Sequence, residues 1–203
     1  MFVRVHSLAP KKLFTTLILG FAFLAIPAWA ADLVLAPLAP QPEASAIESG
    51  LTPIYYYGLY KYVTEVDAAA KRGHGRTGGP IAQIFAKGTG EVLDSHATEG
   101  VGFTIDGLIR FPSAGDWKLV VLSNDGVRIA IDSKVVLEDP DVHADRYSTP
   151  TTVTVPAAGW YKLGVSYFQR HGAWALQLSW KVPGTEDYVP VPAEAFAHLK
   201  TNK

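Results

Sequence analysis

The chain has 203 residues, of which 48% are hydrophobic, and its 18 basic and 19 acidic residues give a net charge of −1. This balance argues against a nucleic-acid partner, whose phosphates require a clear excess of Lys and Arg. The sequence contains no cysteine. Disulfide bonds therefore cannot stabilise the protein, and no lipidated cysteine can tether it.

The first thirty residues have the layout of a secretory signal. Three basic residues precede an apolar run over Leu13–Ile26, and the small-residue pattern Ala28-Trp29-Ala30 follows it. The run is shorter than the ~20 residues that a spanning helix needs, which favours cleavage after Ala30 over a retained membrane anchor. Cleavage removes three of the 18 basic residues and no acid, and leaves 173 residues with a net charge of −4. We expect an exported protein, periplasmic or extracellular, with no membrane insertion after signal removal.

Residues 31–49 are expected to form a proline-rich leader or linker, and residues 50–203 a single domain. Apart from Leu33-Val34-Leu35, the leader has few residues suited to a core. Such a composition is typical of an extended spacer.

From residue 50 onward, strand-like segments recur at short intervals between turns rich in Gly, Pro, Asn and Asp. Alternation of apolar and polar residues is clearest in the last two, where every second side chain can face a core. Helical character is confined to Asp67–Arg72 and Ala193–Lys200. This pattern predicts an all-β fold, an antiparallel β-barrel or sandwich. The predicted strands are Ile54–Val63, Ile81–Phe85, Gly102–Phe111, Asp116–Leu122, Val127–Asp132, Val135–Leu137, Thr151–Val155, Trp160–Phe168 and Trp174–Val182.

Two polar loops interrupt the apolar strands. Ser123–Gly126 separates two apolar strands and is rich in side-chain oxygen. The simplest interpretation is that its Asn and Asp side chains only accept hydrogen bonds from backbone amides of the turn. Gln169–Ala173 separates the last two alternating strands, which indicates an antiparallel hairpin. These loops are the first candidates for a binding site.

A series of motifs runs through the second half of the chain. It consists of Gly102–Ile109, Pro112–Trp117, Ser123–Asp132, His143, Ala158–Leu163, Tyr167–Gly172 and Leu178–Gly184. In this order the motifs resemble the protective-antigen-type (PA-fourteen) domain family, named after the anthrax toxin component that contains it. The resemblance covers most of residues 50–199. It implies an antiparallel β-barrel or sandwich, as in secreted glycosidases, toxins, flocculins and adhesins.

The resemblance also implies a binding site. In lectin-like members of the family, two adjacent acids joined by a cis peptide hold a calcium ion that chelates a sugar diol, and a loop on the late hairpin completes the metal shell. The matching positions make Asn124, Asp125 and Gln169 the candidate metal ligands. Without calcium, we expect a trans bond between Asn124 and Asp125. The full set of candidate ligand-binding residues is Asn124, Asp125, Gly126, Gln169, Arg170, His171 and Trp174.

This chain departs from the family pattern in ways that weaken a calcium site. Asn124 offers a carbonyl oxygen in place of a carboxylate, and calcium affinity rises with the number of carboxylates. Arg170 brings a positive charge to the second loop, and His171 brings a potentially positive one. At 4 Å, each repulsive pair of unit charges costs about 4 kcal/mol, and twice that for a divalent ion. Three interpretations of Asn124-Asp125-Gly126 stay open: turn chemistry alone, a calcium-dependent sugar site, and calcium-free contact with a ligand.

Other patterns favour structural roles. Asp139–Asp145 lacks the spacing of a calcium-binding EF-hand loop and is interpreted as a solvated acidic loop. Gly73–Gly78 matches G-x-G-x-x-G but does not follow a buried strand, so it is interpreted as a mobile basic loop. Most aromatic residues occupy alternating positions typical of a core. Trp174, beside the candidate loop, is the one that could stack on a sugar.

The sequence contains no catalytic pair, triad or nucleophile motif, which predicts a non-catalytic protein. We expect a module that binds carbohydrate or a cell-envelope glycan through Ser123–Gly126 and Gln169–Trp174, with calcium as the one cofactor to consider. The alternative is a structural or assembly module that docks onto another exported protein and has no sugar or metal site.

Overall fold

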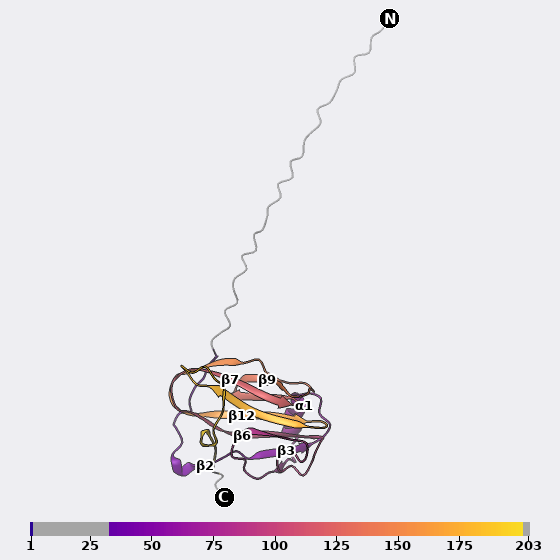
Figure 1. Ribbon diagram of the computed structural model, residues 1–203, viewed down its shortest axis with the longest axis horizontal. Helices are drawn as coiled ribbons and strands as arrows, with labels where there is room; N and C mark the ends of the chain where they lie inside the picture. The colour runs from indigo at the N-terminus through magenta and orange to yellow at the C-terminus, as the bar shows by residue number, and fades with distance from the viewer. Residues whose placement is uncertain (2–32, 201–203) are drawn as a thin grey trace. The chain divides into compact units, whose positions relative to one another are not determined.

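The computed structural model describes Met1 and residues 33–200 (Figure 1). The predicted signal, residues 1–30, lies outside the described residues apart from Met1. Within the described part of the chain, no helix combines the length and the hydrophobicity that crossing a bilayer requires.

Two sheets packed against one another form a β-sandwich, which confirms the predicted all-β class. The first sheet has the order β1-β11-β7-β13-β14, with β5 beside β13 and β10 beside β7. It contains β1 (Leu33–Val34), β5 (Phe85–Gly88), β7 (Gly115–Asn124), β10 (Arg146–Tyr147), β11 (Thr151–Val155), β13 (Trp174–Lys181) and β14 (Val189–Pro190).

The second sheet has the order β2-β15-β6-β12-β8-β9, and β3 pairs with both β6 and β4. Among residues 33–200 the strand pairings are antiparallel, except that β1 runs parallel to β11. The sheet contains β2 (Ile47–Ser49), β3 (Pro53–Tyr57), β4 (Arg76–Thr77), β6 (Val101–Phe111), β8 (Val127–Ile131), β9 (Lys134–Asp139), β12 (Gly159–Gln169) and β15 (Phe196–Leu199).

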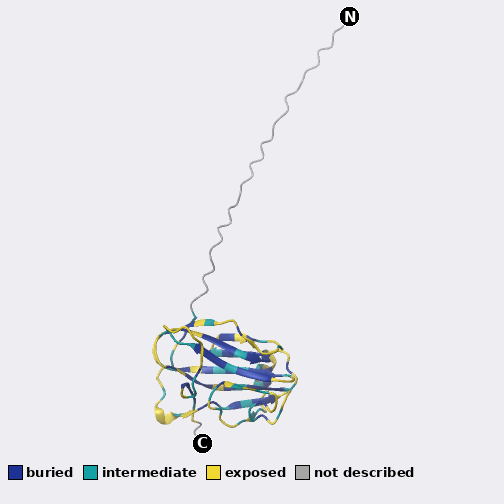
Figure 2. Cartoon of the chain, viewed as in Figure 1, coloured by how far each residue is buried: buried dark blue, intermediate teal, exposed yellow. Residues whose placement is uncertain are grey.

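Period-two alternation builds the core between the sheets (Figure 2). On β7, Trp117, Leu119 and Val121 are fully buried, while the residues between them face outward. The Trp117 ring lies 4.7 Å from that of Trp180 and 5.2 Å from that of Phe111. Burying each such side chain contributes about 1.5–3 kcal/mol. This packed interior fixes the strand ends from which the candidate loops emerge.

One helix, α1 (Val63–Arg72), packs against the second sheet. Its buried face, Val63, Val66 and Ala69, meets Phe168 near the end of β12. The helix ends at Gly73, whose φ of 75° suits a glycine. The helix therefore supports the residue that directly precedes the second candidate loop.

Two predicted elements are wrong at their ends. The predicted strand Ile54–Val63 stops at Tyr57, and Val63 instead opens α1, because burial there follows helical spacing. The predicted helix Ala193–Lys200 is only a 3-10 turn over Ala193–Ala195, followed by β15. A strand pairs with β6 and buries Phe196 and Ala197 together, which outweighs the local helical tendency.

Two further segments differ from expectation. Residues 33–49, expected to be a leader, belong to the folded unit: Leu33–Val34 pairs with β11, Ile47–Ser49 pairs with β15, and Leu35 is buried. The predicted strand Ile81–Phe85 is shifted to Phe85–Gly88, which pairs with β13. In both cases pairing with a distant strand decides the element, and local composition does not reveal that pairing.

Candidate functional site

The two predicted loops lie side by side at one end of the sandwich. β13 pairs with β7 so that Ala175 lies opposite Asn124, and β12 pairs with β8 so that Tyr167 lies opposite Val127. Two backbone hydrogen bonds tie the loops together: Phe168 N donates to Gly126 O at 3.0 Å, and Asp125 N donates to Phe168 O at 3.2 Å. The structure thus brings Ser123–Gly126 and the start of Gln169–Trp174 into one place, as the sequence predicted.

Asp125 is the centre of this arrangement. The residue is 3% exposed. Its carboxylate accepts one backbone hydrogen bond on each oxygen, from His143 N at 3.1 Å and from Arg170 N at 2.7 Å. The donors come from two segments distant in sequence, so the side chain does more than close its own turn. Gly126 must be glycine here, because a Cβ would lie 2.4 Å from the Phe168 ring and 2.7 Å from Pro140 O.

Asn124 is held by two contacts. Its Nδ2 donates to Asp145 Oδ1 at 2.9 Å, and its backbone carbonyl accepts a hydrogen bond from the Tyr167 hydroxyl. The peptide bond from Asn124 to Asp125 is cis. Burial, and after it the Asp125 carboxylate, raises the pKa of Tyr167 well above its usual value. Tyr167 therefore stays a neutral donor that fixes the Asn124 carbonyl.

The side chains of Arg170 and His171 in the second loop point to partners outside the site. Arg170 donates to the backbone carbonyls of Leu59 at 3.3 Å and Tyr60 at 3.1 Å. His171 Nδ1 lies 2.8 Å from the carboxylate of Glu99. Since each is held by acceptors of other segments, the charge repulsion expected at the loop is largely relieved. Arg170 bonds Asp125 through its backbone amide, while its guanidinium bonds the carbonyls of Leu59 and Tyr60.

Buried polar atoms without partners gather at this end of the fold. Within residues 33–200, four buried side-chain atoms have no hydrogen-bond partner. They are Ser123 Oγ, Gln169 Oε1, Trp174 Nε1 and His143 Nε2, the last of which nevertheless lies 3.3 Å from Asp139 Oδ2. Ser123, Gln169 and Trp174 belong to the two candidate loops. His143 lies in another segment, and its backbone amide donates a hydrogen bond to Asp125. Such atoms are rare in folded proteins, and each calls for an explanation such as a bound water or ion.

Gln169 has a defined orientation. Its Nε2 donates to the carbonyls of Gly172 at 3.1 Å and Ala173 at 3.0 Å, so the amide cannot be turned round without facing oxygen to oxygen. Its Oε1 is consequently left as a buried, unpartnered acceptor. The residue is fully buried, and its two hydrogen bonds stabilise the loop that follows it.

Trp174 does not take the predicted sugar-stacking role. Its side chain is 7% exposed and belongs to the core between the sheets, in line with Leu176 and Leu178 on β13. The alternation along β13 turns it inward, away from solvent.

The acidic segment Asp139–Asp145 is only partly the solvated loop that was predicted. Asp139 is buried at the end of β9 and pairs with the guanidinium of Arg146, whose Nε lies 2.7 Å from Oδ2. This bond raises the pKa of Arg146. Asp145 and the backbone of His143 join the candidate site, which sequence reasoning missed. The sequence signals were the density of acids around Asp145, which was assigned to solvent, and the place of His143 in the motif series, which gave it no role.

The Gly73–Gly78 segment is held in place, contrary to the predicted mobile loop. Arg76–Thr77 forms β4 against β3, and Arg76 Nε donates to the Tyr57 hydroxyl at 3.0 Å. The guanidinium also lies 4.9 Å above the Tyr55 ring. These contacts give the segment a structural explanation.

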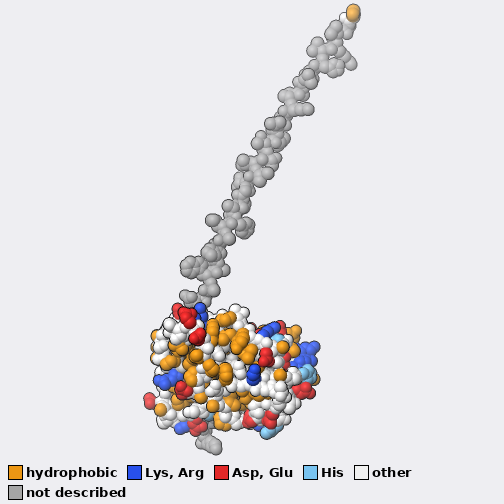
Figure 3. All heavy atoms as spheres, viewed as in Figure 1, with side chains coloured by type: hydrophobic (Ala, Val, Ile, Leu, Met, Phe, Trp, Pro, Cys, Tyr) orange, Lys and Arg blue, Asp and Glu red, His pale blue; other side chains and the backbone are white. Residues whose placement is uncertain are grey.

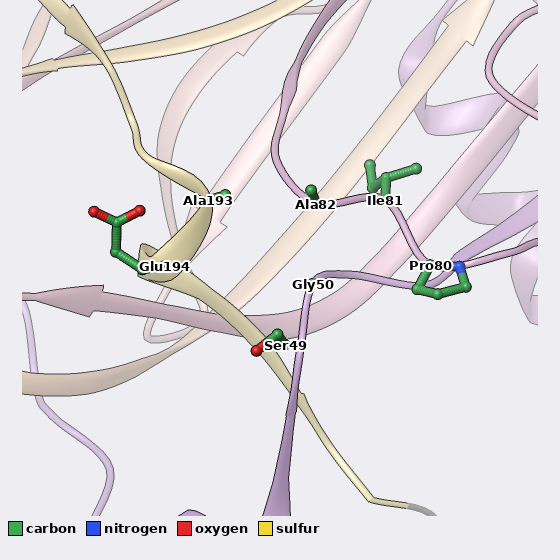
Figure 4. Close-up of a pocket in the computed structure, with 7 residues that line it drawn as sticks. All are labelled: Ser49, Gly50, Pro80, Ile81, Ala82, Ala193 and Glu194. Atoms are coloured by element: carbon green, nitrogen blue, oxygen red, sulfur yellow. The ribbon is translucent and has the colours of Figure 1, made fainter.

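A hollow elsewhere on the molecule is a weaker candidate. Figure 4 shows the seven residues that line it, which come from the end of β2, the segment around Ile81 and the turn before β15. The lining is mostly small or apolar, and Glu194 is its single ionisable side chain. It lacks the convergent polar groups that define a specific site.

Comparison with known proteins places the fold. The model of the PA14 domain matches residues 49–194. Among solved structures, the PA14 domain of MpAFP antifreeze protein is 16% identical, with a TM-score of 0.65 over 77% of this chain and 93% of that one. The PA14 sugar-binding domain from an RTX adhesin is 18% identical, with a TM-score of 0.62 over 74% of this chain and 98% of that one.

A third structure is the Epithelial Adhesin 9 A domain from Candida glabrata in complex with Galβ1-3GlcNAc. It is 13% identical, with a TM-score of 0.62 over 82% of this chain and 96% of that one. No curated protein matches the chain. The sandwich, the ordered motifs and a family match over most of the described residues lead to one conclusion: this chain belongs to the PA14 domain family.

Proposed function

We propose that this protein is an exported, non-catalytic module that binds carbohydrate where the ends of β7 and β12 meet. The observation that carries the proposal is the buried Asp125 carboxylate together with the unpartnered Gln169 Oε1, since a buried polar atom without a partner calls for an explanation such as a bound ion. Two structural neighbours support the ligand class: one is a sugar-binding domain of an adhesin, and another is bound to Galβ1-3GlcNAc.

The residues present fit a calcium ion. The side-chain ligands would be oxygens, which calcium prefers: the Asp125 carboxylate, the side-chain amide oxygen of Asn124 and the unpartnered Gln169 Oε1. Asp145 adds a second carboxylate beside Asn124, at 2.9 Å from its amide nitrogen. Within the described residues, no three His, Asp or Glu side chains are spaced to hold a metal by themselves. Calcium would therefore depend on the amide oxygens of Asn124 and Gln169 as well as on Asp125.

The burial of Asp125 favours the calcium-dependent form of the proposal. At 3% exposure the carboxylate offers little surface to a sugar ring, but its oxygens keep lone pairs beyond the two backbone bonds. A bound calcium would supply a positive centre for two sugar hydroxyls. The chain's own contribution is to hold Asp125 through the amides of His143 and Arg170 and to keep the side chains of Arg170 and His171 bonded to other segments.

The test is a thermal-shift titration of the purified protein with calcium chloride and EDTA, paired with a glycan array. Calcium at about 100 times its dissociation constant should add roughly 2.7 kcal/mol to the free energy of unfolding. Asp125→Asn should abolish both this shift and glycan binding. Asp106→Asn, which changes an exposed acid on β6, is the matched control and should keep both.

The outcomes separate the two parts of the proposal. Glycan binding that persists in EDTA but is lost in Asp125→Asn would remove the metal and keep the sugar site. The proposal for these loops would be overturned if calcium leaves the melting temperature unchanged and Asp125→Asn leaves glycan binding unchanged.

A further inference from the structure

An aromatic groove of about 540 Å³ runs over the outer face of the first sheet. Its three aromatic side chains are Phe85, Tyr147 and Tyr188, which are 38%, 64% and 39% exposed. Figure 3 shows hydrophobic side chains gathered over the part of the domain where Figure 1 draws β7. Exposed aromatics assembled in one groove, in a fold with a well-filled core, indicate a binding surface.

Strand register sets the width of the groove. On β13, Gln177 lies opposite Phe85 of β5 on one side and opposite Leu122 of β7 on the other. Leu122 in turn lies opposite Tyr147 of β10. Phe85 and Tyr147 are thus three strand spacings apart, about 14 Å between backbones. Their side chains flank a trough wide enough for one extended chain.

The chemistry of the lining favours a neutral sugar. None of the residues that line the groove is charged. Ser148 Oγ accepts a hydrogen bond from Val121 N at 3.2 Å, which leaves its hydroxyl hydrogen free to donate. Aromatic faces beside hydroxyls match the apolar C–H faces and polar rims of hexose rings.

An extended peptide suits the groove less well. A peptide that adds to a sheet needs an unpaired strand edge. The floor strands, β7 and β13, are paired on both sides: β7 with β13 and with β10 and β11, and β13 with β7 and with β5 and β14. Their backbone groups are already used, so only side chains are offered.

The groove continues toward the proposed sugar site. Val120, Leu122 and Asn124 alternate along the same outward face of β7, and Val120 lines the groove while Asn124 lies in the site. Four residues of strand separate them by about 13 Å. Beside them on β13, Ser179 lies opposite Val120 and Ala175 opposite Asn124. A glycan that ends at Asp125 can therefore extend across this face.

We propose that the aromatic groove is a second subsite, which holds the inner, uncharged hexose units of a glycan whose end binds at Asn124 and Asp125. The inference rests on the proposed function, and it specifies an extended neutral glycan as the ligand. Tyr147 forms the most exposed wall and contributes the largest stacking surface.

The experiment measures the affinity of the full chain for neutral oligosaccharides of one to six hexose units, by isothermal titration with those that a glycan array selects. Affinity should rise with length. Tyr147→Ala should weaken binding of the longest oligosaccharide by about five- to ten-fold and leave the shortest unchanged, as loss of one aromatic contact predicts. Tyr147→Phe should restore the affinity, because stacking needs the ring and not the hydroxyl.

Leu199→Ala, at an exposed apolar position of the second sheet, is the control and should have no effect. Asp125→Asn separates the two sites: if it abolishes binding while Tyr147→Ala changes nothing, the groove proposal is wrong and the loop site stands. If Tyr147→Ala weakens binding while Asp125→Asn does not, the groove stands without the loop site. Failure to bind any neutral glycan, or capture of a polypeptide by a photo-crosslinker at position 147, overturns the glycan subsite.

Discussion

Strand β8 is flanked by two turns that use aspartate in different ways. At its end, the Asp132-Ser133 turn lies at the surface, and Asp132 Oδ2 accepts from Lys134 Nζ at 2.5 Å and from Ala36 N at 2.9 Å. At its start, the Asn124-Asp125-Gly126 turn is buried, and its carboxylate is held by amides of His143 and Arg170. The first turn keeps its carboxylate at the surface beside a lysine, and the second buries its carboxylate between two backbone amides.

The comparison decides how far turn chemistry explains each loop. Asp132 satisfies its carboxylate with a nearby lysine and the backbone amide of Ala36, and water reaches the remainder. Asp125 lies among buried atoms that lack partners, such as Gln169 Oε1. Turn chemistry alone therefore accounts for the first turn and leaves the second unexplained.

The largest expected difference is between Asp125→Ala and Asp132→Ala. Removing Asp125 leaves two partly buried backbone amides without acceptors, and each costs about 1–3 kcal/mol, so we expect a loss of about 2–4 kcal/mol in the free energy of unfolding. Asp132→Ala exposes its donors to water and should cost less than about 1 kcal/mol. Urea unfolding of both variants measures the difference. Equal losses would show that the two turns are the same kind of structure.

A second contrast comes from the glycine that follows Asp125. Gly126→Ala places a methyl group against the Phe168 ring and Pro140 O, and overpacking of this kind costs about 1–3 kcal/mol. Ser133 has a φ of 61°, so Ser133→Gly relieves the exposed turn and should change stability by only a few tenths of a kcal/mol. Thermal unfolding of the pair checks both. A well-folded, equally stable Gly126→Ala variant would contradict the described packing.

Much of the sandwich follows from local pattern. Thr151–Val155 has the same bounds as predicted, and the alternation in Trp174–Val182 correctly places its tryptophans on one face. The ordered motifs also predict that the two loops lie together. Alternation fixes which side chains face the core, and motif order fixes which strand ends are neighbours.

What the sequence could not predict depends on partners far along the chain. Arg170 turns away because the carbonyls of Leu59 and Tyr60 accept it, and His171 turns toward Glu99. Asp145 reaches Asn124 across 21 positions of sequence. No local pattern contains these pairings, so the charge penalty at the site was overestimated and the extra carboxylate was missed.

Asn124→Asp tests how the site uses Asp145. The new carboxylate would face the Asp145 carboxylate where an amide now donates, so without calcium we expect a loss of about 1 kcal/mol in the free energy of unfolding. With calcium the added charge should raise affinity, by about ten-fold. Calorimetric titration and unfolding with and without calcium measure both effects. Asp132→Asn, in the exposed turn, is the control for a simple change of charge, and unchanged calcium affinity in Asn124→Asp would argue against a metal at this turn.

The smallest effect concerns pH and the exposed turn. The hydrogen bond from Lys134 holds the pKa of Asp132 below its ordinary value of 3.8. Because the folded-state pKa is lowered, the ionised carboxylate stabilises the fold above pH 3.8, and this contribution is lost as the pH falls through the lower folded-state value. At a partly exposed pair it amounts to less than about 0.5 kcal/mol. The stability difference between the native protein and Asp132→Asn, measured by urea unfolding, should therefore narrow between pH 6 and pH 2.5. If the stability difference between the two proteins instead grows as the pH falls, the ionised Asp132 carboxylate does not stabilise the fold through Lys134.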